Sequence, residues 1–183
     1  ERGLTQNNNI KIIGITGTKG KGTTSTLLYK ILKTAGRNVY LASNIGKPAL
    51  EILSKLKNKL KKTQKCCYKS DRCYNGTFIV LELSSFQLQG LKYSPDIAVV
   101  LDTFPDHLDS HKNFREYINA KTNIAKWQKK TDKIFYFSDN KYAKWIASKS
   151  PAEKNPVQCQ EVGSPNIKPS ILGRSDLQIL KKN

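Results

Sequence analysis

A glycine-rich segment near the start of the chain, Gly17-Thr18-Lys19-Gly20-Lys21-Gly22-Thr23-Thr24, holds the residues best suited to chemistry. Glycines let backbone N–H groups approach oxygen anions, and a helix that begins there adds partial positive charge. The Lys21 ammonium can reach terminal phosphates, and a hydroxyl after it can hold Mg²⁺. The usual nucleotide loop has glycine where this chain has Ile15, and a hydroxyl where it has Gly22. A plain glycine-rich turn is the alternative, but the lysine, the threonines and their context favour phosphate binding.

A carboxylate, Glu82, stands inside an otherwise apolar run, residues 78–83, and Ser84 and Ser85 follow it. Burial of a carboxylate is costly unless it is paired or bound to metal. Glu82 could instead lie where the strand end reaches the surface at the sheet edge, or it could form a salt bridge with a lysine. We expect a Mg²⁺ role, because the phosphate loop would lie at the end of the neighbouring strand.

The two histidines of the chain, His107 and His111, lie four residues apart, beside Asp106 and Asp109. Histidine and carboxylate side chains can both bind metal ions. By itself the cluster is a weak signal, since Asp109 or Ser110 could simply cap the helix that follows.

Lys121 shares one face of the next predicted helix with Phe114, Ile118 and Ala125, at spacings of four, three and four residues. A lysine on such a stripe usually extends its amine to solvent, and periodicity alone favours that outcome. Otherwise the amine needs a charge partner or a chemical change.

The elements that must position these residues alternate along the chain, which predicts an α/β fold with a mostly parallel sheet covered by helices on both faces. Ligands of such sheets bind beyond the carboxyl ends of the strands, where the polar segments described above lie. Strands are predicted at residues 10–16, 38–42, 78–83, 96–101 and 133–137. Helices are predicted at residues 21–35, 48–60, 113–129 and 140–148. After Pro151, prolines and glycines interrupt the pattern and no further element is predicted.

Composition limits the class of protein. The 183 residues suit one domain, or one and a piece, with a net charge of +18. No apolar run approaches the length of a membrane span, and residues 1–9 lack a secretion signal. The four cysteines fit neither a zinc site nor a disulfide framework, so we interpret them as free thiols of a cytoplasmic protein.

The positive charge raises the alternative of a nucleic-acid-binding module. Part of it is concentrated in residues 55–74, where eight Lys and Arg residues face one acid, Asp71. We interpret residues 57–77 as a basic insertion before the third strand. The run lacks aromatic interleaving and the chain lacks zinc-finger spacing, so no nucleic-acid partner is expected as the main role.

The motifs together resemble the Mur ligase family. They are Gly17-Thr18-Lys19-Gly20-Lys21, Asn44-Ile45-Gly46, Glu82 to Leu88, Asp106-His107-Leu108-Asp109 and Ala120-Lys121. The order and approximate spacing match over about residues 10–150. The resemblance implies that residues 10–150 are the family's central ATP-binding domain, with residues 1–9 as a linker and residues 151–183 as the incomplete end of that domain. It also implies N-terminal and C-terminal domains outside this chain.

The segment Glu82 to Leu88 is most similar to the branch of the family that adds D-glutamate to UDP-N-acetylmuramoyl-L-alanine, in peptidoglycan precursor synthesis. That resemblance implies an ATP-dependent amide ligase. ATP phosphorylates the L-alanine carboxylate, and the amine of D-glutamate attacks the acyl phosphate. The implied partners are these substrates, ATP and two Mg²⁺ ions, with no membrane partner.

The resemblance also implies roles for individual residues. Lys21, His107 and Lys121 are the implied catalytic residues, and Asn44 and Ser84 the implied contacts of the muramoyl substrate. The implied nucleotide-binding residues are Gly17, Thr18, Lys19, Gly20, Lys21, Gly22 and Thr23. The implied Mg²⁺ ligands are Thr23, Glu82, His107 and Lys121, the last as a carbamate formed with CO₂.

Two departures from the family pattern lie in the phosphate loop. Lys19 replaces a usual asparagine and adds a cation to the loop. Gly22 is typical instead of folylpolyglutamate synthase, a related ligase in which the next hydroxyl binds Mg²⁺; that role therefore falls to Thr23. A folylpolyglutamate synthase-like ligase thus remains an alternative, as does a nucleotide-binding fragment without ligase turnover.

Overall fold

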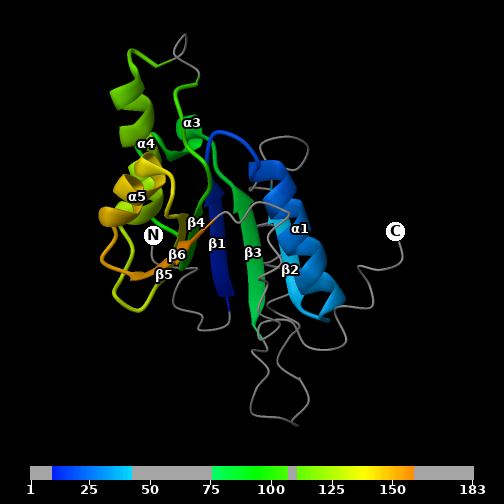
Figure 1. Cartoon of the computed structure of the whole chain (residues 1–183). Coiled ribbons are helices and arrows are strands. Elements are labelled where there is room, and N and C mark those ends of the chain that lie inside the picture. The colour runs from blue at the N-terminus through cyan, green and yellow to red at the C-terminus, as the bar shows by residue number, and fades with distance from the viewer. Residues whose placement is uncertain (1–9, 43–75, 107–110, 159–183) are drawn as a thin grey trace.

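The computed structural model describes residues 10–42, 76–106 and 111–158. Within these ranges, six parallel strands form one sheet in the order β2-β3-β1-β4-β5-β6, as Figure 1 shows. The strands are β1 Ile10–Thr16, β2 Asn38–Ala42, β3 Thr77–Glu82, β4 Ile97–Val100, β5 Lys133–Phe137 and β6 Glu153–Val157. The predicted parallel α/β fold is therefore confirmed.

The helices of the described ranges are α1 Lys21–Thr34, α3 Ser85–Leu88, α4 Phe114–Lys126 and α5 Lys141–Ser148. Helix α1 ends at Thr34, and two residues later Gly36 turns the chain with a left-handed φ of 70°, while the Arg37 N–H donates to the Leu32 carbonyl at 2.9 Å. Helix α4 begins after Asn113, whose side chain accepts from the Glu116 N–H at 2.9 Å. The idea that Asp109 or Ser110 caps this helix is wrong.

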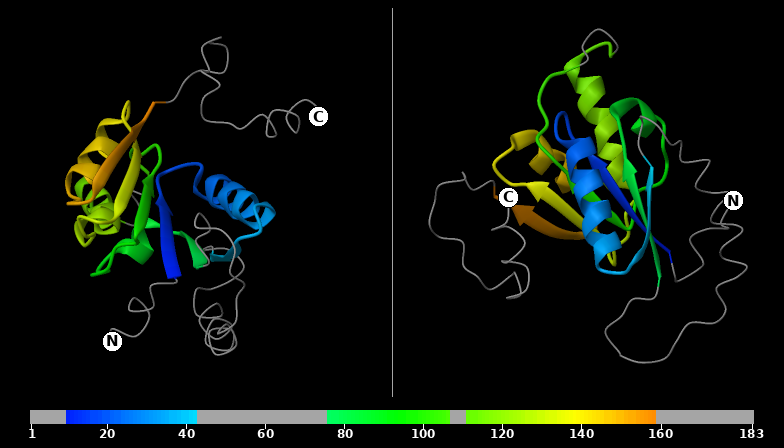
Figure 2. Two further views of the ribbon diagram at one scale, coloured as in Figure 1. Left: turned by 90° about the horizontal axis from the view of Figure 1, so that it is seen from below. Right: turned by 90° about the vertical axis from the view of Figure 1, so that its right-hand side faces the viewer.

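The helices cover both faces of the sheet, which Figures 1 and 2 show with α1 on one side and α4 and α5 on the other. On the α1 side, Leu28 and Leu32 pack against Ile13, Ile15 and neighbouring strand residues. On the other side, apolar residues of α4 and α5 pack against β4 and β5. Alternate residues of the strands therefore serve two cores, as a sheet covered on both faces requires.

The connections that follow the neighbouring strands β1 and β4 run toward opposite edges of the sheet. From β1 the chain runs through α1 to β2 on one side, and from β4 it runs through α4 to β5 on the other. The carboxyl ends of two such strands form the crevice in which open parallel sheets bind ligands. The loops after β1 and β4 meet there.

Two elements were not predicted from the sequence. Strand β6 contains Pro156, which breaks the usual strand pattern, but β6 is the last strand in the described sheet, and an edge tolerates a residue without an N–H. Helix α3 is a single turn closed by Ser84 and Gln87. The helix predicted at residues 48–60, residues 57–75 of the basic insertion and the four cysteines lie outside the described residues. The predicted end of the insertion at residue 77 is wrong, because Thr77 already begins β3. No described helix is long and apolar enough to cross a membrane.

Candidate functional site

The predicted phosphate loop joins β1 to α1 and is anchored to the end of β4. A side chain on Gly17 would place its Cβ 2.8 Å from the Leu101 Cβ, so this close approach requires glycine. Gly20, which precedes α1, has a left-handed φ of 80°. The Thr18 N–H donates to the Asp102 carbonyl at 2.7 Å. These constraints hold the loop in the crevice between β1 and β4.

The start of α1 points into this loop. In the described structure no side chain caps it, and its first turn contains no acidic residue. The first backbone N–H groups of a helix lack intrahelical acceptors and carry partial positive charge. Together with the loop, this end of α1 has the chemistry of a phosphate site.

The amine of Lys21 lies against the loop. Its Nζ donates to the carbonyl oxygens of Gly17 at 3.2 Å and Thr18 at 2.9 Å. The predicted cation is therefore at the loop itself. Lys19 extends from the same loop to the aromatic ring of Phe104, with 5.5 Å between its Nζ and the ring centroid.

The Thr18 hydroxyl connects the loop to two other elements. It donates to the Phe104 carbonyl and accepts from the Phe104 N–H, both at 3.0 Å, and it lies 3.0 Å from the Tyr117 hydroxyl of α4. Burial raises the pKa of Tyr117 above its usual value. Because the Thr18 hydroxyl gives its own proton to Phe104, the Tyr117 hydroxyl is the donor in their contact. Thr18 is thus a structural junction of the loop.

Lys121 is buried beneath the same loop, with 1% of its surface exposed. Its Nζ donates to the Gly17 carbonyl at 2.9 Å and to the Thr16 hydroxyl at 3.3 Å, and it lies 4.7 Å from the centroid of the Tyr117 ring. The amine is directed into the site. The expectation from periodicity alone, that it extends to solvent, is wrong.

The surroundings of Lys121 make its amine weakly basic. Burial, followed by the nearby Lys21 cation, lowers its pKa to about 7, although the Asp106 carboxylate acts in the opposite direction. A substantial fraction of the amine is therefore uncharged at neutral pH. An uncharged amine is the form that reacts with electrophiles such as CO₂.

Glu82 lies beside the first turn of α1. The sheet register pairs it with Ile15, just before the loop. A Cβ built on Gly22 would stand 3.7 and 3.9 Å from the two carboxylate oxygens. The position of Glu82 next to the loop, expected from the sequence, is confirmed, whereas its role as a metal ligand stays a prediction.

The serines after β3 have separate structural roles. Ser84 caps α3: its hydroxyl oxygen accepts from the Gln87 N–H, and the Gln87 side chain accepts from the Ser84 N–H. This cap leaves the Ser84 hydroxyl proton available for donation. Ser85 is buried, and its hydroxyl lies 2.9 Å from Nε2 of His111.

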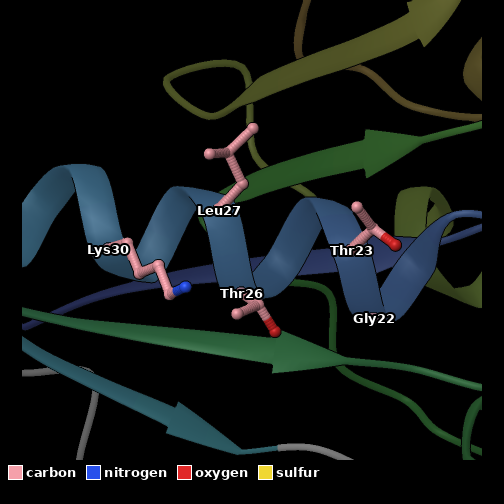
Figure 3. Close-up of a pocket in the computed structure, with 5 residues that line it drawn as sticks. All are labelled: Gly22, Thr23, Thr26, Leu27 and Lys30. Atoms are coloured by element: carbon pink, nitrogen blue, oxygen red, sulfur yellow. The ribbon is translucent and has the colours of Figure 1, made fainter. Parts of the chain in front are cut away.

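An open hollow of about 470 Å³ runs along α1 from the loop. Figure 3 shows Gly22 and Thr23 at one end of it and Thr26, Leu27 and Lys30 further along the helix. The hollow therefore includes Thr23, the predicted hydroxyl ligand, on the exposed side of the first turn.

Two predicted site residues, Asn44 and His107, lie outside the described residues. Within the described ranges, no group of three His, Cys, Asp or Glu side chains is placed to hold a metal ion. The described part of the site thus brings together the loop, Lys21, Thr23, Glu82 and Lys121.

Sequence reasoning missed Tyr117 and Asn140. Tyr117 lies one helical turn before Lys121, and that spacing is the signal that could have identified it. Asn140 caps α5 with its side-chain oxygen, and its amide donates to the Thr103 carbonyl at 3.0 Å and the Asp102 carboxylate at 3.3 Å. It holds the loop after β4 in place.

Known proteins resemble the chain in sequence. A protein named UDP-N-acetylmuramoylalanine–D-glutamate ligase from Clostridium tetani is 42% identical over 134 residues, which cover 73% of this chain and 26% of the relative. Its namesake from Clostridium acetobutylicum is 43% identical over 130 residues, 71% of this chain and 24% of the relative. The chain therefore spans about a quarter of the length of these relatives.

Solved structures resemble the fold. A UDP-N-acetylmuramoyl-L-alanyl-D-glutamate–2,6-diaminopimelate ligase superposes with a TM-score of 0.61 at 21% identity, over 88% of this chain and 35% of that one. MurF from Acinetobacter baumannii gives 0.58 at 17% identity, over 83% and 32%. Residues 15–166 match the family described as the Mur ligase middle domain. Because that match spans most of the sequence, the chain belongs to the Mur ligase family.

Proposed function

We propose that this chain is the ATP-binding part of a ligase that joins D-glutamate to UDP-N-acetylmuramoyl-L-alanine in the cytoplasm, for peptidoglycan precursor synthesis. The observation that carries the proposal is the meeting of Lys21 and Lys121 at the phosphate loop, beside Glu82. The names of the relatives, at 42% and 43% identity, support the choice of substrates. The rest of the enzyme would come from domains outside this chain.

In this proposal the backbone of residues 17–23 binds the phosphates of ATP. Lys21 moves its amine from the loop carbonyls to the γ-phosphate, where its charge stabilises the transferring group. The muramoyl-alanine carboxylate, held with the help of Asn44 and Ser84, accepts the phosphoryl group. The amine of D-glutamate then attacks the acyl phosphate, an amide forms and phosphate leaves.

The residues around the loop suit Mg²⁺. Thr23 lies in the first turn of α1 and the Glu82 carboxylate lies beside its neighbour Gly22; both supply oxygen ligands and would hold one ion. His107 and Lys121 would hold a second. Bound Mg²⁺ would neutralise charge on the phosphate oxygens during transfer.

We propose that Lys121 serves as a carbamate. As a free cation it would be withdrawn from water and close to the Lys21 ammonium, and these two effects, burial first, lower its pKa. The ammonium first loses a proton; the neutral amine then reacts with CO₂, which forms a C–N bond and releases a second proton. A repelled cation thus becomes an anionic oxygen ligand. The group would then balance the charge of Lys21 and the metal.

An assay with the longest polypeptide that contains this sequence tests the proposal. The expected result is ADP and phosphate release that requires UDP-N-acetylmuramoyl-L-alanine, D-glutamate and Mg²⁺ together. A parallel reaction with a reduced folate and L-glutamate tests the alternative suggested by Gly22. Turnover with folate and not with the muramoyl substrate would overturn the proposal.

A further inference from the structure

A buried polar contact links the start of α3, just after β3, to the segment that precedes helix α4. His111 is 3% exposed and Ser85 is 2% exposed, and Nε2 of His111 lies 2.9 Å from the Ser85 hydroxyl. The two residues are 26 positions apart in the sequence. A hydrogen bond inside a buried region holds its partners more firmly than one in water, and its loss leaves a polar group unsatisfied.

Aromatic rings continue this contact on both sides of His111. The imidazole stacks on the ring of Phe86, with 4.8 Å between centroids and 11° between planes. It also meets the ring of Tyr117 edge-on at 5.4 Å. His111 is thus held between α3 and α4 by one hydrogen bond and two ring contacts.

The contacts form a continuous path through the site. Ser85 follows Ser84, the proposed substrate contact, and begins α3. At the other end, the Tyr117 hydroxyl reaches Thr18 of the phosphate loop at 3.0 Å. The path therefore connects Ser84, the proposed contact of the muramoyl substrate, with the loop proposed to bind ATP. His111 lies in the middle of this path.

We propose that His111 is a positioning residue that fixes the Ser84 turn, and with it the muramoyl carboxylate, relative to Lys121 and the phosphate loop. This inference rests on the function proposed above. Because the hydrogen bond to Ser85 is on the acid-substrate side, its loss changes the use of that substrate. ATP binding depends on the loop anchored through Thr18 and is preserved.

The test is a double-mutant cycle in the longest polypeptide that contains this sequence. Ser85→Ala removes the hydroxyl, and His111→Phe keeps a ring for both aromatic contacts while it removes the hydrogen bond. Each is expected to raise the KM for the muramoyl substrate about three- to tenfold and to leave the KM for ATP within about twofold. The double variant is expected to be no worse than the single variants, since all three lack the same bond.

A matched control separates positioning from stability. Ser150→Ala removes another buried serine hydroxyl, which donates to Gln128 at 2.7 Å outside the described site. It is expected to lower the melting temperature but not to change either KM. His111→Gln can reach Ser85 with a polar group. Its KM for the muramoyl substrate is therefore expected to lie between those of His111→Phe and the wild type.

The outcomes are decisive. An unchanged muramoyl KM in Ser85→Ala, equal changes in both KM values, or the same KM change in Ser150→Ala would each overturn the positioning role. Failure of the proposed function is recognised separately, since wild-type protein would then show no ligase turnover with the muramoyl substrate.

Discussion

Lys21 and Lys121 donate hydrogen bonds to one and the same acceptor, the carbonyl oxygen of Gly17, at 3.2 and 2.9 Å. The two lysines come from helices on opposite faces of the sheet. Burial, and then repulsion by the Lys21 ammonium, lowers the pKa of Lys121, so the buried amine yields its proton more easily. The phosphate loop is therefore where α1 and α4, which pack on opposite faces of the sheet, bring their lysine amines together.

Replacement of Lys21 by methionine is expected to lower kcat by about 100-fold or more, because the transferring phosphoryl group loses a nearby charge. ATP binding should weaken as well. Lys33→Met, at the distant end of α1, is the matched control and should retain activity. Steady-state kinetics and ATP titration measure both effects, and normal turnover by the Lys21 variant would remove this residue from the proposed role.

Replacement of Glu82 by glutamine preserves the shape of the side chain and removes its charge beside α1. Because a neutral amide is a poorer Mg²⁺ ligand than a carboxylate, the Mg²⁺ concentration needed for half-maximal activity should rise several-fold. Titration of activity with Mg²⁺ at saturating ATP makes the comparison. An unchanged Mg²⁺ requirement would show that Glu82 has a structural role only.

Replacement of Lys121 by alanine should abolish ligase activity and leave space where the carbamate would stand. Short carboxylic acids such as acetate or propionate should restore part of the activity, since they supply the missing oxygen ligands. Chloride at equal ionic strength is the control. A fully active alanine variant would contradict the carbamate proposal, and so would mass spectra that show Lys121 unmodified under bicarbonate in an active enzyme.

The stability of the protein should depend on pH through Lys121. Its pKa is lowered to about 7 in the folded state, while an unfolded chain retains the ordinary value near 10.5. Folding must therefore expel a proton between these values, and the penalty grows as pH falls toward 7, by at most about 1.4 kcal/mol per pH unit. Below pH 7 the penalty is complete and constant.

Lys121→Met removes this penalty. Its gain in unfolding free energy over the wild type should be largest near pH 6.5 and should shrink as pH rises to 9. Urea denaturation in CO₂-free buffer at both pH values measures the difference. A gain that does not vary with pH would mean that the amine titrates as an ordinary surface lysine.

The sequence was sufficient for most of the sheet, because each central strand is apolar and the helices α1, α4 and α5 repeat their apolar residues with helical spacing. Predicted bounds of β1, β2 and β5 agree with the structure, and those of β3 and β4 differ by one residue. Strand β6 was missed because its exposed position and its proline remove the apolar signal. Such a strand forms by pairing with β5, a long-range contact that local pattern does not encode.

The candidate site was predicted in part. Motif and spacing placed Lys21 and Glu82 at the ends of adjacent strands, as the register of β1 and β3 bears out. The direction of the Lys121 amine could not be predicted from periodicity, which gives the face of a helix but not the length of the path to solvent. Tyr117 was missed as part of the site, and His111 was considered only as a possible metal ligand, because their partners, Thr18 and Ser85, are remote in sequence.

The bond from the Thr18 N–H to the Asp102 carbonyl also makes this amide a natural reporter for solution measurements. An amide held by a short 2.7 Å bond in a buried residue exchanges its hydrogen with solvent only when the loop separates from the end of β4. Its exchange rate therefore counts openings of the crevice between β1 and β4. This one signal would therefore record how often the phosphate loop leaves its anchor at the end of β4.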